Sequence, residues 1–196
     1  MKSLFLILIA LVSCIPGGYY KVENFKEIND FYINRVMQAA RNQFYADAMT
    51  NADLMTVEPI ALYSQVVAGM NYKVIIATQA YANTRNDIQI HEYKFYQPLK
   101  FDQNSVPELE LVGQIKHFES NGISLNSPRF AQVNAAISQY LMKSSNKLHS
   151  VVDVKAIDAE GETFYVAKCD ITGQNIQSGF VLTENHGQYE ILTKLN

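Results

Sequence analysis

Cysteine is scarce in this chain, and its scarcity limits how the fold can be stabilised. The 196 residues contain two cysteines, Cys14 and Cys169, and Cys14 falls in an N-terminal segment that we expect to be removed. Cys169 would then stand alone, which excludes an intrachain disulfide, so the fold must rest on its hydrophobic core. Because Cys169 lies in an apolar strand pattern, we interpret it as a small buried hydrophobic residue rather than a functional thiol.

Charge is also sparse and nearly balanced. Lys and Arg number 16 against 19 Asp and Glu, for a net charge of −3, and no basic stripe is present. This pattern excludes the electrostatic footprint of a nucleic-acid-binding protein. An acidic cluster in the second half is interpreted as a solvated hairpin face; its members are Asp153, Asp158, Glu160 and Glu162.

The sequence offers little to support catalysis. Its four histidines lack metal-ligand spacing, and no glycine-rich phosphate loop or Ser/His/Asp or Cys/His pairing stands out. We therefore expect no cofactor, no bound metal and no enzymatic activity. A small enzyme on a related helix-on-sheet fold remains a third alternative, which would require a polar pocket lined by a titratable pair.

The longest apolar run, from Leu4 to Val12, is too short for a membrane span, which needs ~20 such residues. With Lys2 ahead of it, the run is typical of a secretory signal peptide covering residues 1–14. The protein is therefore expected to be secreted or to enter the endomembrane or lysosomal lumen, without a stable membrane span. Residues 11–14 also resemble a bacterial lipobox, in which Cys14 would carry a lipid anchor.

Hydrophobic periodicity predicts an α+β protein made of two similar units, 15–118 and 123–196, joined by a linker at 118–122. In each unit, one helix would pack across a four- to five-stranded antiparallel sheet. The first unit should contain a helix at 27–48 and strands at 55–68, 72–79, 88–96 and 108–116. The second should contain a helix from about 127 to 145 and strands at 150–157, 163–169, 177–183 and 189–194.

The stretch from Gln65 to Gly69 joins two extended runs and predicts a hairpin tip. Hairpin tips normally carry polar turn residues because water surrounds them, whereas this tip is small, apolar and uncharged. We interpret it as a wedge that enters a cleft, although a plain half-buried hairpin would share its alternation. Gln65, Val67 and Gly69 resemble the Gln-x-Val-x-Gly signature of the cystatin superfamily, and the flanks are similar to the stefin branch.

This resemblance implies a reversible, non-covalent inhibitor that blocks the active-site cleft of papain-like, cathepsin-type cysteine proteases. The family uses an N-terminal arm and two hairpin loops. The corresponding protease-binding residues would be Gly17 and Gly18 in the arm, Gln65, Val66, Val67, Ala68 and Gly69 in the first hairpin, and Pro98 and Leu99 in the second. The order Pro98-Leu99 departs from the Leu-Pro of stefins, and the chain has no Trp for the Pro-Trp of other cystatins. The arm could instead be a flexible linker, and the second hairpin a simple connecting turn.

The second unit lacks the inhibitor signature, since Ile157-Asp-Ala-Glu-Gly161 retains only the glycine that corresponds to Gly69. Burying the unpaired carboxylates of Asp158 and Glu160 in a protease cleft would be costly, so we expect this unit to be inert toward such proteases. An alternative is a non-inhibitory secreted binding module, as in the latexin type of tandem cystatin-like protein. The resemblance is compatible with a monomer or a domain-swapped dimer.

Overall fold

The computed structural model describes residues 18–48, 55–80, 87–99, 108–144, 146–174 and 177–195. This part of the chain contains two helices and two antiparallel sheets, which confirms the α+β class. Neither helix in the described ranges is long and apolar enough to cross a membrane. The expected signal peptide and Gly17 lie outside the described residues.

The first sheet is built from residues 20–117. Its strand order is β1-β2-β3-β4-β5, with β6 also paired to β4, and all neighbours are antiparallel. Helix α2 spans Phe31–Asp47. The strands are β1 (Tyr20–Lys21), β2 (Met55–Val67), β3 (Gly69–Ala80), β4 (Ile88–Pro98), β5 (Glu110–Leu111) and β6 (Lys116–His117). The expected single strand at 108–116 is thus wrong, because Gly113, in the left-handed region at φ 79°, separates two short strands.

The second sheet repeats this plan with the order β11-β10-β9-β8-β7. Helix α3 spans Pro128–Lys143. The strands are β7 (Asn121–Gly122), β8 (Leu148–Ala159), β9 (Glu162–Ile171), β10 (Ser178–Asn185) and β11 (Gln188–Leu195). The end of the predicted linker is therefore a strand, since β7 pairs with β8 as β1 pairs with β2.

Side-chain caps decide where both helices begin. Asp30 accepts hydrogen bonds from the backbone N–H groups of Tyr32 and Ile33 at 2.8 and 3.0 Å, so α2 starts at Phe31 and the predicted start at 27 is wrong. Ser127 caps α3 in the same way, accepting from the N–H of Phe130 at 3.1 Å. The buried stripe of α2 is Val36, Met37, Ala40 and Phe44.

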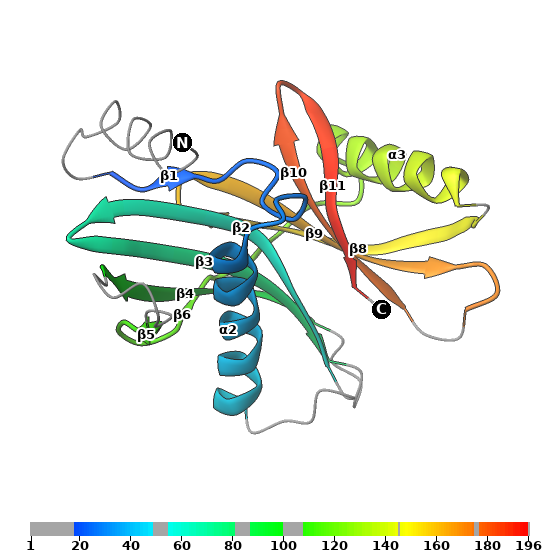
Figure 1. Ribbon diagram of the computed structural model, residues 1–196. Coiled ribbons are helices and arrows are strands. Elements are labelled where there is room, and N and C mark those ends of the chain that lie inside the picture. The colour runs from blue at the N-terminus through cyan, green and yellow to red at the C-terminus, as the bar shows by residue number, and fades with distance from the viewer. Residues whose placement is uncertain are drawn as a thin grey trace.

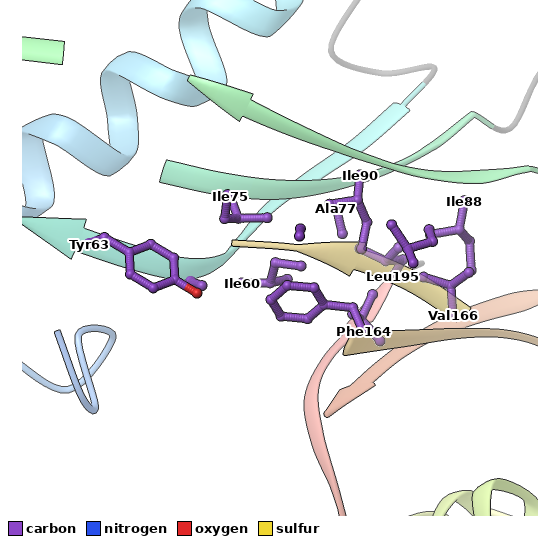
Figure 2. Close-up of a cluster of buried hydrophobic side chains, with 13 residues drawn as sticks. Ile60, Tyr63, Ile75, Ala77, Ile88, Ile90, Phe164, Val166 and Leu195 are labelled. Carbon is purple, nitrogen blue, oxygen red and sulfur yellow. The ribbon is translucent and has the colours of Figure 1, made fainter. Parts of the chain in front are cut away.

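The molecule has four layers, with a helix on the outer face of each of two stacked sheets (Figure 1). Helix α2 packs on the first sheet through one cluster of buried residues, and α3 packs on the second sheet through another. A third cluster joins the two sheets and draws residues from both units (Figure 2). It contains Ile60, Ala61, Tyr63, Ile75, Ala77, Ile88 and Ile90 from the first sheet, and Ile157, Ala159, Phe164, Val166, Val181 and Leu195 from the second.

This arrangement explains why the central strands are apolar on both faces. In β3, Val74 and Ile76 point to α2, whereas Ile75 and Ala77 point to the other sheet. A strand covered on both sides has a continuous hydrophobic run instead of alternation. The two units therefore share a core as well as having one each.

Candidate functional site

Three segments of the first sheet end at the same edge of the molecule. They are residue 18 before β1, the β2–β3 turn at residues 65–69, and Pro98–Leu99 at the end of β4; together we name them the tip edge. Figure 1 shows the start of β1, the β2–β3 turn and the end of β4 on one side of the sheet. The pairing registers place them together, since Gly69 lies opposite both Val67 and Pro98.

The predicted hairpin at residues 65–69 is confirmed. Val67 pairs directly with Gly69, which leaves Ala68 alone at the apex. The Gln65 side-chain oxygen accepts a hydrogen bond from the Asn71 side-chain amide at 3.0 Å. As expected from the sequence, Gln65 thus braces the turn through its amide group.

Tyr96 supports the apex from the neighbouring strand, and we did not predict this contact. Its hydroxyl donates a hydrogen bond to the backbone carbonyl of Ala68 at 2.9 Å. Gly69 is buried beneath it, and a Cβ there would overlap the carbonyl oxygen of Gln97 and approach the Tyr96 ring to 2.8 Å. Glycine is therefore required at residue 69 because the backbone of β3 passes so close to β4. The sequence predicted a strand that ends at Tyr96, but it did not reveal that the Tyr96 hydroxyl would bind the Ala68 carbonyl.

The apex itself is apolar and open. Val66 and Val67 are 56% and 41% exposed, and Leu99 beside them is 60% exposed. Ala68 is exposed as well. Exposed aliphatic side chains gathered at one protruding edge are typical of a surface that binds another protein.

The N-terminal segment approaches the tip edge along β2. Tyr20 pairs with Ser64 and Lys21 with Tyr63, and the Val22 N–H donates to the Leu62 carbonyl at 2.8 Å. Since this pairing is antiparallel, the chain before Tyr20 runs toward the β2–β3 turn. Gly18 is exposed, with nothing within 4 Å of where a Cβ would stand, so the free protein itself does not require glycine there.

The second unit presents a different hairpin end. Its turn at Glu160 and Gly161 was expected, but a solvated acidic face is wrong for two of its four carboxylates. Glu160 forms an ion pair with Lys73, and Glu162 accepts a hydrogen bond from the Tyr63 hydroxyl at 2.7 Å. The turn of the second unit thus packs on the first unit and is not a free wedge.

Two pairs of titratable side chains come together that sequence spacing did not reveal. The Nδ1 atoms of His91 and His117 lie 2.8 Å apart, and His91 Nε2 lies 3.1 Å from the Thr78 hydroxyl. Burial, followed by the charge of His117, lowers the pKa of His91 to about 4. The second pair is Glu92 and Glu160, in which burial and then Glu160 raise the pKa of the Glu92 carboxyl.

The histidine pair links β6 to β4, because His91 of β4 and His117 of β6 are also paired along the backbone. It borders a hollow of about 470 Å³ that includes Asp87 and Lys155. A larger hollow of about 780 Å³ lies between residues 21–27 and the hairpins of the second unit. Among the described residues, no group of three or more His, Cys, Asp or Glu side chains could hold a metal ion.

Cys169 is buried, as predicted. Burial is also the main reason that the pKa of its thiol rises to about 12, with a smaller contribution from Asp170. A thiol that stays protonated at neutral pH is a poor nucleophile.

Comparisons with known proteins add little to this geometry. No family model matches the chain, and no curated protein matches it. Among solved structures, an "Ntf2 like protein involved in plasmid conjugation" is 14% identical, with 76% of this chain and 80% of that chain covered, at a TM-score of 0.26. A similarity that low carries no argument about fold or function.

Proposed function

We propose that this protein is a reversible, non-covalent inhibitor of papain-like cysteine proteases, built from two cystatin-like units of which the first binds the protease. The observation that carries this proposal is the tip edge: a braced apolar turn, flanked by the N-terminal segment on one side and by Pro98–Leu99 on the other. Such an edge can fill a cleft without any covalent step.

The rigidity of the tip suits tight binding. The apex is held by Tyr96 from the side and by the Gln65–Asn71 contact from within the hairpin. A loop that is ordered before binding loses less conformational entropy when it enters a groove. Since Val66, Val67 and Leu99 are exposed in the free protein, their burial would supply favourable apolar contact.

The features of the second unit favour a single inhibitory site, which lies in the first unit. Its corresponding turn carries Glu160 in place of an apolar residue, and that side chain is engaged with Lys73. Entry of this turn into a cleft would break the ion pair and desolvate the carboxylate, which is unfavourable.

The test is titration of the purified protein against papain, with Val67→Glu as the probe. A carboxylate buried without a partner should weaken binding by about 3 kcal/mol or more, which is at least ~100-fold in the dissociation constant. Val152→Glu is the matched control, because Val152 is also a strand valine, 42% exposed, but on β8 of the second unit. Gly69→Glu is less suitable, since a side chain at residue 69 would disturb Tyr96.

Inhibition by the parent protein and by Val152→Glu, and its loss in Val67→Glu with unchanged circular dichroism, would support the proposal. Equal inhibition by both variants would show that the protease binds to a surface other than the tip edge. Absence of inhibition by the well-folded parent would favour a non-inhibitory binding module.

A further inference from the structure

The turn between β8 and β9 in the second unit reaches the N-terminal segment of the first unit. Glu162 uses both carboxylate oxygens: one accepts from Lys21 Nζ at 2.7 Å and the other from the Tyr63 hydroxyl at 2.7 Å. Lys21 lies in β1 and Tyr63 in β2, at directly paired positions. A single carboxylate of the second unit therefore bridges the two strands whose pairing orients the N-terminal arm.

Glu160 acts on the same arm through Lys73. The Lys73 ammonium forms an ion pair with Glu160 and stands 4.2 Å from the centre of the Tyr19 ring. This position over the ring face gives a favourable cation–π contact. Lys116 Nζ lies 3.7 Å from the other carboxylate oxygen of Glu160. Both Lys73 and Glu160 are largely shielded from water, where such interactions are screened less than at an open surface.

The backbone at this turn is held in an unusual conformation for a glutamate. Glu160 has φ 53° and Gly161 has φ 83°, as in the two-residue hairpin turns that favour Asn or Asp followed by Gly. Local propensity does not account for a glutamate in the first of these positions. Its long side chain, in contrast, reaches Lys73, which a shorter Asn or Asp would approach less closely.

The electrostatics keep the Glu160 carboxylate charged. Burial opposes its ionisation, but the hydrogen bonds from Lys73 and Glu92 and the nearby lysine charges bring its pKa below the usual value. Glu92, which is almost fully buried, has a raised pKa for the reasons given above and can supply the proton in its contact with Glu160. The two carboxyls are therefore compatible as neighbours.

We propose that Glu160 and Glu162 are positioning residues, with which the second unit clamps residues 19–21 along β2 so that Gly18 of the N-terminal arm is held at the tip edge. This inference rests on the proposed function as far as the purpose of the arm is concerned. Two residue pairs and the adjacent Val22–Leu62 backbone hydrogen bond join β1 to β2, and such a short strand frays readily without further contacts. A clamped arm has less conformational freedom to lose when it binds a protease.

The clamp can be tested without any protease. Glu162→Gln and Glu160→Gln remove one charge each, and Glu190→Gln, at an exposed glutamate of β11, is the matched control. The Val22 N–H is the reporter, because it donates to the Leu62 carbonyl; we expect it to exchange with deuterium about tenfold faster in the two clamp variants than in the parent or the control. Cleavage by trypsin after Lys21 should accelerate in parallel. Unchanged exchange and cleavage in both variants would overturn the clamp.

A second experiment tests whether the clamp contributes to protease binding. In a papain titration, Glu162→Gln should raise the dissociation constant by about three- to tenfold, mainly through faster dissociation. The charge-swapped double variant Lys21→Glu/Glu162→Lys should recover part of this loss, which a general loss of stability would not do. Lys21→Met breaks the same pair from the exposed arm, should Glu162→Gln fold poorly.

The outcomes separate the two proposals. If the parent does not inhibit papain, the proposed function fails, while the exchange and trypsin data still decide whether the second unit holds the arm. If exchange accelerates but the dissociation constant of an inhibiting protein stays constant, the clamp exists and its positioning role is overturned.

Discussion

Replacing Phe164 with alanine tests whether the two sheets form one cooperative structure. Phe164 lies in β9, is 0% exposed, and belongs to the cluster that joins the two sheets. Figure 2 shows it between the sheets, close to Ile60 and Val166. Because its ring fills space between both units, its removal should weaken both of them together.

The expected cost is large relative to the total stability. A buried Phe→Ala substitution typically costs about 3–5 kcal/mol, against about 5–15 kcal/mol for the unfolding of a whole domain. The matched control is Phe31→Ala, since Phe31 is 59% exposed at the start of α2. This control should cost less than about 1 kcal/mol, as most surface substitutions do.

Urea unfolding monitored by circular dichroism and by tyrosine fluorescence provides the measurement, with no Trp in the chain to dominate the signal. We expect one transition with both probes, shifted strongly by Phe164→Ala and little by Phe31→Ala. In Phe164→Ala, hydrogen exchange should show that the free energy of opening falls by a similar amount in β3 and in β10. Two separate transitions, or equal losses for the two variants, would refute the view that the sheets share a core.

Two further predictions concern buried titratable groups. Because the pKa of His91 is about 4 in the folded protein, against about 6.5 for an exposed histidine, the unfolded chain binds more protons between these pH values. His91 should then contribute up to about 3 kcal/mol of stability above pH 6.5, lost as the pH falls toward 4. Urea unfolding across this range should show a steeper loss for the parent than for His91→Gln, and equal slopes would contradict the assignment. The native protein at pH 8 should react with iodoacetamide only slowly at Cys169 and rapidly once unfolded in urea, because burial keeps the thiol protonated; rapid labelling of the native protein would show that the site is open.

The hairpin at residues 65–69 illustrates what local sequence can reveal. Two extended runs meeting at Ala68 and Gly69 predicted a turn, and the paired strands confirm it. The acidic character of the other turn was equally visible, but its environment was not. Glu160 and Glu162 were interpreted as solvated because isolated carboxylates usually face water, and only long-range packing brings Lys73 and Lys21 to them.

The shared core has a signal in the sequence of the central strands. The runs Val74–Ala77 and Phe164–Ala167 are apolar without alternation, which is expected of strands covered on both faces. A helix over one face accounts for only half of these side chains. The helix start was missed for a local reason, since Ile28 continues the four-residue spacing while the Asp30 cap stops the helix after it.

The sequence by itself determined the elements: two amphipathic helices, the strands that follow them, the turns at Gly69 and Gly161, and the apolar apex between Gln65 and Gly69. These features depend on neighbours a few residues apart, where spacing and backbone preference act directly. The tertiary structure alone decided that the two sheets stack, that Tyr96 braces the apex, and that Glu162 joins Lys21 from 141 positions away. Contacts of that kind are set by how buried surfaces fit together, and residue spacing along the chain does not encode them.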